Sequence, residues 1–255
     1  IQYNCLRQDF FLEEQGVVGK MVADRRIYEE GISSGLGPLL RLGGESNKGV
    51  KNMSKLTPEQ MKKHVEVMQD FLHFLNLKTN NYVLKGGTAL LFGYKLDRFS
   101  EDLDFDSVDP RTFKDVLDKY CRLRGYSYTT KKDTETVKRY MLQYDATVPA
   151  LKMEISFRSK EIPLGWTTYI DGMKVYTIDA LAQKKALAYN GRDRIRDLYD
   201  VSFIVNKYWN QLSESAQEII TDALNTKGFN QFEYLLDQEP DDLVNNDKLL
   251  DMFLN

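Results

Sequence analysis

The stretch YVLKGGTALLFGYKLDRFSEDLDFD, residues 82–106, constrains this chain more than any other. YVLK has the composition of a short buried strand, and Gly86 and Gly87 precede a helix-compatible run. Alternation on a strand puts Asp102, Asp104 and Asp106 on one side, opposite Leu103 and Phe105. Glycines at a helix N-terminus let backbone amides approach an anion, and a following threonine adds a hydroxyl donor. The stretch therefore predicts a phosphate turn next to an acidic strand.

Clustered carboxylates of this kind favour a cation. Two carboxylates about 4 Å apart repel by roughly 4 kcal/mol at an effective dielectric of about 20. Oxygen ligands without nearby Cys or His favour Mg²⁺ or Mn²⁺ over zinc. An EF-hand calcium-binding loop is excluded, because Ser107 occupies the position at which that loop requires glycine and Phe113 the position at which it requires glutamate. No GxxxxGK[ST] is present, and an acid-x-acid pair alone is often only a solvated strand face.

Composition narrows the alternatives further. The formal net charge of −3 gives no global reason for nucleic-acid binding, so such a contact would need a local basic patch. The two cysteines lack CxxC spacing and the two histidines lack the spacing of a helical zinc pair. With no apolar run of about 18 residues and no signal pattern at the start, we expect a cytoplasmic protein without a membrane partner.

The expected secondary structure changes twice along the chain. Residues 1–50 combine a weakly periodic stretch with a glycine-rich linker, residues 51–177 mix strands and helices, and residues 178–255 are helical in pattern. The middle region begins with a helix that Thr57 caps, with a capping box to Gln60. Its apolar face is expected at Val65, Met68, Phe71, Leu72 and Leu75, and a hairpin is expected around Asp171-Gly172. We expect an α+β fold, in which a small mixed sheet flanked by helices is followed by a C-terminal helical region.

Three motifs in order carry a family resemblance. They are Gly86-Gly87-Thr88, the R-x-S-E-D-x-D segment from Arg98 to Asp104, and a later lysine followed by Arg196-Asp197-Leu198-Tyr199-Asp200. The stretch resembles the signature of the AbiEii/AbiGii toxin-like nucleotidyltransferases of the polymerase-beta-type superfamily. Thirteen residues separate Thr88 from Asp102, longer than the superfamily spacing but matched by this family.

The resemblance implies roles for particular residues. Asp102, Asp104 and Glu154, the third acid, would hold Mg²⁺ or Mn²⁺, and Glu154 would assist deprotonation of the acceptor hydroxyl. Gly86, Gly87 and Thr88 would hold the phosphates of an NTP, with Arg98, Ser100, Lys184 and Arg196 as further nucleotide-binding residues. Lys184 is also expected to act in catalysis. The family moves a nucleoside monophosphate to an acceptor hydroxyl, which can be RNA including tRNA ends, and pairs with a cognate antitoxin.

Each assignment has a structural alternative. Lys184 fits an ordinary solvated helix face, Arg98 an ion pair with Glu101 or Asp102, and Arg196 an ion pair with Asp197 or Asp200. Glu161 is an alternative third acid. Basic and aromatic residues interleave on the strands expected near residues 126–144, where a solvated sheet face over packed tyrosines is favoured over a nucleic-acid surface. A non-catalytic nucleotide-binding module and a phosphotransferase acting at the γ-phosphate are the competing functions.

Overall fold

The computed structural model describes residues 56–238 and 241–254. The features below belong to the compact unit Asn52–Leu249, except that the last helix continues to Leu254. The stretch expected to be helix-compatible within residues 1–30 and the glycine-rich linker lie outside the described residues. The domain division at residues 51 and 178 stays a prediction.

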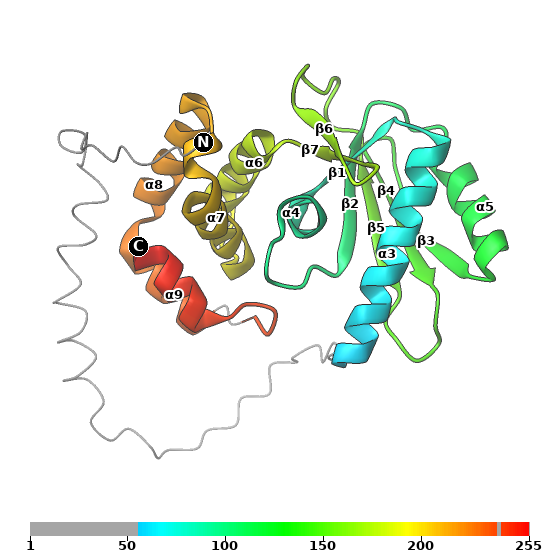
Figure 1. Cartoon of the computed structure of the whole chain (residues 1–255), viewed down its shortest axis with the longest axis horizontal. Helices are drawn as coiled ribbons and strands as arrows, with labels where there is room; N and C mark the ends of the chain where they lie inside the picture. The colour runs from blue at the N-terminus through cyan, green and yellow to red at the C-terminus, as the bar shows by residue number, and fades with distance from the viewer. Residues whose placement is uncertain (1–55, 239–240, 255) are drawn as a thin grey trace, which may run out of the picture. The chain divides into compact units, whose positions relative to one another are not determined.

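One mixed sheet organises this unit (Figure 1). Its strand order is β3-β4-β5-β2-β1-β7-β6. The strands are β1 (Tyr82–Lys85), β2 (Asp102–Ser107), β3 (Ser127–Asp133), β4 (Val137–Gln143), β5 (Leu151–Ser156), β6 (Thr167–Ile170) and β7 (Met173–Tyr176). Pairings are antiparallel except for β1 with β7 and β2 with β5, which are parallel.

Helices flank the sheet and follow it along the chain. They are α3 (Pro58–Lys78), α4 (Gly86–Tyr94), α5 (Phe113–Arg124), α6 (Ile178–Gly191), α7 (Ile195–Tyr208), the short η1 (Trp209–Gln211), α8 (Glu214–Gln238) and α9 (Asn246–Leu254). α8 bends at Gly228, where a φ of 65° suits glycine. The expected fold class, a mixed sheet flanked by helices and followed by C-terminal helices, is confirmed.

α3 begins as its sequence predicts. The Thr57 hydroxyl accepts a hydrogen bond from the Gln60 amide at 3.2 Å, and the Gln60 side chain accepts one from the Thr57 amide at 2.8 Å. This capping box satisfies two backbone donors that a helix start leaves open. Met68, Phe71, Leu72 and Leu75 are buried as expected. Val65 is only half-buried and Val67 takes its place, because the buried face lies slightly to one side of the expected one.

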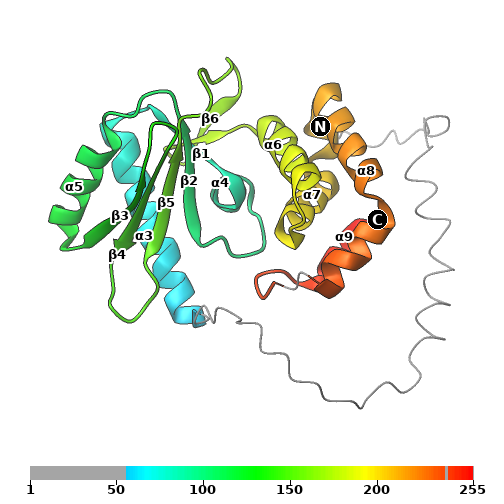
Figure 2. The ribbon, with the colours of Figure 1, turned by 180° about the vertical axis from the view of Figure 1, so that it is seen from behind.

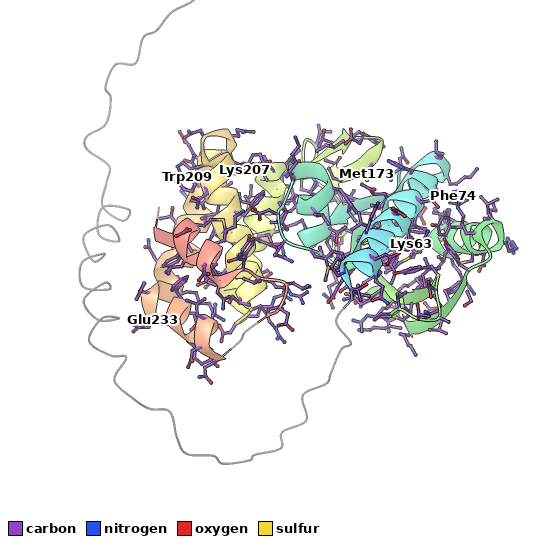
Figure 3. All side chains as sticks on the ribbon, turned by 60° about the horizontal axis from the view of Figure 1, so that its bottom comes forward. Lys63, Phe74, Met173, Lys207, Trp209 and Glu233 are labelled. Atoms are coloured by element: carbon purple, nitrogen blue, oxygen red, sulfur yellow. The ribbon has the colours of Figure 1, made fainter. Side chains whose placement is uncertain are left out.

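The two sides of the sheet are covered differently (Figures 1 and 2). α3 and α5 lie on one side, where the Phe113 ring stacks on Tyr140 at 5.7 Å and meets Tyr82 edge-on. α3 also contacts β7, in which Met173 is buried (Figure 3). α4 lies on the other side, against β1, β2 and β7. The side covered by α4 is the one that carries the acidic residues of β2.

The last two strands along the chain, β6 and β7, form the expected hairpin. β6 and β7 pair around Asp171 and Gly172, and both turn residues have positive φ angles of 48° and 76°. Such angles fit a tight hairpin turn between twisted strands. No helix among the described residues is long and apolar enough to cross a membrane.

Candidate active site

The glycine turn lies directly against the acidic strand. Gly86 has a φ of 73°, and a Cβ at that position would lie 3.5 Å from Oδ2 of Asp104. A Cβ at Gly87 would lie 2.9 Å from both the Arg98 guanidinium and the Ser100 hydroxyl. Real Cβ atoms do not approach so closely without a shift of the neighbours. Glycine is therefore required here by backbone angle at one position and by close packing at the next.

Strand register brings the predicted acids to one side of the sheet. Asp104 lies opposite Lys85 on β1 and opposite Glu154 on β5. Asp102 lies opposite Lys152 on β5. Because paired residues share a side of the sheet, the carboxylates of Asp102, Asp104 and Glu154 all project toward the side of α4. The parallel pairing of β2 with β5 joins acids that are far apart in the sequence.

Two of these three acids have basic partners. Lys152 donates a hydrogen bond to Asp102, and Arg139 donates one to Oε2 of Glu154 at 2.7 Å. Asp104 forms no hydrogen bond or ion pair within the described part of the chain. Burial is the largest influence on Asp104 and raises the pKa of its carboxyl; Asp102 and Glu154 add to this, and Lys152 opposes it. Asp104 is the carboxylate most in need of an external cation.

Asp104 and Glu154 line a cavity of about 510 Å³. The glycine turn forms another part of its wall, and α6 contributes the apolar side chains of Leu181, Leu187 and Ala188. Five basic residues also line it: Lys85, Arg158, Lys184, Lys185 and Arg192. The cavity thus joins two acids, a helix N-terminus and a cluster of cations, an arrangement suited to a polyphosphate and a metal ion.

Asp106 organises two of the lysines. Its carboxylate accepts hydrogen bonds from Lys85 at 2.5 Å, Lys184 at 3.0 Å and the Tyr176 hydroxyl at 2.9 Å. The Lys184 ammonium also lies 4.5 Å from the centre of the Tyr176 ring. Burial alone would raise the pKa of Asp106, but the two lysines outweigh it and the pKa is lower than usual. Asp106, set apart from the predicted metal set, holds Lys85 and Lys184 at the cavity wall.

Three predicted nucleotide-binding residues lie behind the turn. The Thr88 hydroxyl is 2.7 Å from the Ser100 hydroxyl and donates to the Asp102 carbonyl. Arg98 is buried and donates two hydrogen bonds of 2.8 Å to the carboxylate of Asp200, not to Glu101 or Asp102. These bonds fasten the segment between α4 and β2. In this structure the three side chains support the turn from inside the protein.

A second ionic network joins α6 to α7. Lys185 pairs with Asp200 at 2.6 Å and with Asp197 at 3.4 Å, and Arg192 pairs with Asp197 at 2.6 Å. Burial would raise the pKa of Asp197, but Arg192 and Lys185 outweigh it and lower that pKa. The network places Lys185 and Arg192, which both line the cavity, in fixed positions.

Arg196 has different partners from those expected. Its guanidinium pairs with Asp241 at 2.5 Å and with Glu101 at 3.4 Å, rather than with Asp197 or Asp200. It does not line the cavity described above. Arg196 therefore links α7 to the start of β2 and to the segment before α9.

Sequence reasoning did not select several basic residues of the site. Lys152 shares a strand face with Glu154 by simple alternation, and Lys85 directly precedes the turn, so both positions carried a local signal. Lys185 was passed over for Lys184, yet both line the cavity. His64 was also missed: its ring is within 2.8 Å of the Glu101 carbonyl and 2.6 Å of the Tyr144 hydroxyl, bracing the approach to β2.

The donor set fits a hard divalent cation in chemistry. Across residues 56–238 and 241–254, no three His, Cys, Asp or Glu side chains are already gathered in a form that could hold a metal ion. Asp102 and Glu154 instead hold Lys152 and Arg139, and Asp104 between them is open. Carboxylate oxygens are the ligands that Mg²⁺ and Mn²⁺ prefer, so these three acids could hold the ion once the basic groups give way.

Comparison with known families decides the relationship. The model of the nucleotidyl transferase AbiEii toxin family, type IV toxin–antitoxin system, matches residues 73–251. This chain belongs to the AbiEii family. The family match includes the glycine turn, β2, β5 and the α6–α7 network. The AbiEii chain is accordingly a nucleotidyltransferase, as the motifs predicted.

Solved structures agree with this assignment. A candidate nucleotidyltransferase from H. pylori is 29% identical, with a TM-score of 0.63, over 77% of the AbiEii chain and 92% of that protein. JHP933 from Helicobacter pylori is also 29% identical, with a TM-score of 0.64, over 78% and 90% of the two chains. No curated protein matches the chain significantly.

Proposed function

We propose that this AbiEii enzyme transfers a nucleoside monophosphate from an NTP to an acceptor hydroxyl, with Mg²⁺ or Mn²⁺ as cofactor. The observation that carries the proposal is the cavity in which the open carboxylate of Asp104 lies beside Glu154 and faces a wall of cations. Two acids alone would fit many sites. Acids joined to a glycine turn and five basic side chains match the charge distribution of a nucleoside triphosphate with its metal.

The triphosphate lies against the basic wall in this proposal. Lys184, Lys185 and Arg192 neutralise its negative charge, and the backbone amides after Gly86 and Gly87 bind phosphate oxygens at the N-terminus of α4. Lys184 forms an ion pair with Asp106, which holds the ammonium in place. The apolar residues of α6 offer a surface for the base.

Asp102, Asp104 and Glu154 hold the divalent cation. A bound ion would supply Lewis-acid charge neutralisation at the phosphoryl oxygens. Glu154 is also the residue we assign to accept the proton of the acceptor hydroxyl. The acceptor oxygen forms a bond to the α-phosphorus as the bond to the β-phosphate oxygen breaks, and pyrophosphate leaves.

Thr88, Ser100 and Arg98 have positioning roles in this scheme. Their hydrogen bonds fix the turn and the start of β2, so they act on the nucleotide through Gly87 and Asp102. Arg196 fixes Glu101 in the same way.

The biological setting follows from the family. We propose that the chain acts in the cytoplasm as the toxin of a toxin–antitoxin pair, modifies RNA such as a tRNA end, and is neutralised by a cognate antitoxin. The family description as a type IV toxin supports the pairing.

The test uses each α-³²P NTP with total cellular RNA and Mg²⁺. Wild type should label an RNA species, and Asp104→Asn should lower labelling at least about 100-fold, since electrostatic groups of this kind contribute that much. Asp115→Asn, an exposed acid on α5, is the matched control and should label like wild type. Continued labelling by the Asp102→Asn/Asp104→Asn double variant would refute the proposal.

Product analysis separates the competing functions. Pyrophosphate release accompanies nucleotidyl transfer. Metal-dependent NTP binding without release would indicate a binding module, and release of a nucleoside diphosphate would indicate transfer of the γ-phosphate.

A further inference from the structure

The row of residues that contains Asp104 and Glu154 continues across the sheet. Glu154 on β5 lies opposite Arg139 on β4, and Arg139 lies opposite Lys132 on β3. With Lys85 and Asp104, this gives one row over five adjacent strands on the same side. The reacting acids therefore have a continuous extension toward the free edge of the sheet at β3.

Among residues 56–238 and 241–254, no helix covers this extension on the side of the acids. α4 contacts β1, β2 and β7, which lie at or beyond the acidic strand. On β3, Thr129 and Lys132 are exposed, and on β4, Arg139, Met141 and Gln143 are partly exposed. Both views of the ribbon place α3 and α5 on the opposite side of the sheet from α4 (Figures 1 and 2). We call these five residues the acceptor face.

The opposite side of the same strands is closed. Tyr140 is buried under Phe113, and the Tyr128 hydroxyl donates to Asp118 of α5 at 2.6 Å. Lys138, next to Arg139 on β4, lies on this opposite side and pairs with Asp133 at 3.5 Å. Of the tyrosines interleaved with basic residues, Tyr140 is therefore buried and Tyr128 packs edge-on against it. The basic residue Lys138 on this side has its own acid.

The charge of the acceptor face is positive. Its register positions on β3 and β4 carry polar, apolar or basic side chains and no acid. Lys132 forms no ion pair within the described part of the chain, and Arg139 forms an ion pair with Glu154. An uncovered cationic strip without stacked aromatics suits a phosphate backbone and not the faces of bases.

Resting on the proposed nucleotidyl transfer, we propose that the acceptor face binds the phosphate backbone of the single-stranded end of the acceptor RNA and leads its terminal hydroxyl to Glu154. Lys132 is two strand spacings from Glu154, about 10 Å at about 4.8 Å per strand. That span corresponds to about three phosphates at the stacked rise of about 3.4 Å. Backbone contacts position a strand without reading its sequence, so the acceptor face sets where the RNA end lies and not which RNA is chosen.

Binding is tested first without NTP. The probe is a fluorescein-labelled 12-nucleotide oligouridine, followed by anisotropy with the full chain at several salt concentrations. Lys132→Gln should raise Kd about 3- to 10-fold and reduce the slope of log K against log salt by about 1, as expected for one lost phosphate contact. Lys138→Gln removes an equal charge from the closed side of β4, next to Arg139, and should change neither quantity.

Transfer kinetics supply the second readout. Lys132→Gln should raise KM for RNA while leaving kcat and KM for the NTP unchanged, which a general loss of folding would not do. Equal Kd values and salt slopes for the Lys132 and Lys138 variants, in an enzyme that labels RNA, would overturn the acceptor face but leave the proposed function intact. An enzyme that labels no RNA at all would instead overturn the proposed function. If Lys132→Gln leaves RNA binding unchanged but impairs neutralisation by a co-expressed antitoxin, the face binds a protein and the RNA proposal is wrong.

Discussion

Replacing Asp200 by Ala should destabilise the fold more than any exposed acid replacement. Asp200 is fully buried and accepts two hydrogen bonds of 2.8 Å from Arg98, with Lys185 at 2.6 Å. Removing the carboxylate leaves the buried charges of Arg98 and Lys185 without this partner. Breaking a buried pair from one side costs about 3–5 kcal/mol, and whole domains have stabilities of only about 5–15 kcal/mol.

The measurement is urea unfolding followed by circular dichroism at neutral pH. The matched control is Asp193→Ala, which removes a 2.7 Å pair with Lys227 in which Asp193 is half-exposed. Exposed pairs contribute about 0–1 kcal/mol, so this control should shift the unfolding free energy by less than about 1 kcal/mol. Because Arg98 supports Gly87 and Lys185 lines the cavity, Asp200→Ala should also reduce transfer where it remains folded. A loss no larger than that of the control would refute the reasoning.

Three further predictions concern the site itself. Asp104→Asn should stabilise the metal-free protein at pH 7. Because the pKa of Asp104 is raised in the folded state, its ionisation lowers the stability of wild type as the pH rises from about 4 through that folded pKa. The difference in melting temperature between the variant and wild type should therefore vanish near pH 3. Equal melting curves at pH 7 would contradict this. Gly87→Ala should lower the melting temperature by several degrees because its Cβ would lie 2.9 Å from Arg98, whereas Gly191→Ala has open space and should change it little. Lys152→Met should lower metal-free stability and increase the melting shift produced by Mn²⁺, since the acids lose their internal cation; an unchanged Mn²⁺ shift would show that the lysine does not compete with the metal.

Local patterns in the sequence predicted the parts of the fold that depend on near neighbours. The capping box at Thr57 and Gln60, the alternation of Asp102 and Asp104, and the hairpin at Asp171 and Gly172 each depend on residues within a few positions. The order of three motifs was also enough for the AbiEii family and for nucleotidyl transfer as its activity. The roles of the individual site residues stay predictions, now with defined surroundings.

Only the tertiary structure decided which charges meet. Arg98 pairs with Asp200 and Arg196 with Asp241, partners 102 and 45 positions away, where the sequence offered nearer acids. The parallel pairing of β2 with β5 likewise set Lys152 against Asp102. An ion pair is fixed by distance in space, and the sequence order of distant strands and helices does not contain that distance. The sequence by itself predicted a glycine turn beside an acidic strand, because both features depend on residues within a few positions. The folded chain determined that Lys152 pairs with Asp102 and Arg139 with Glu154, and that Asp104 forms no ion pair among the described residues.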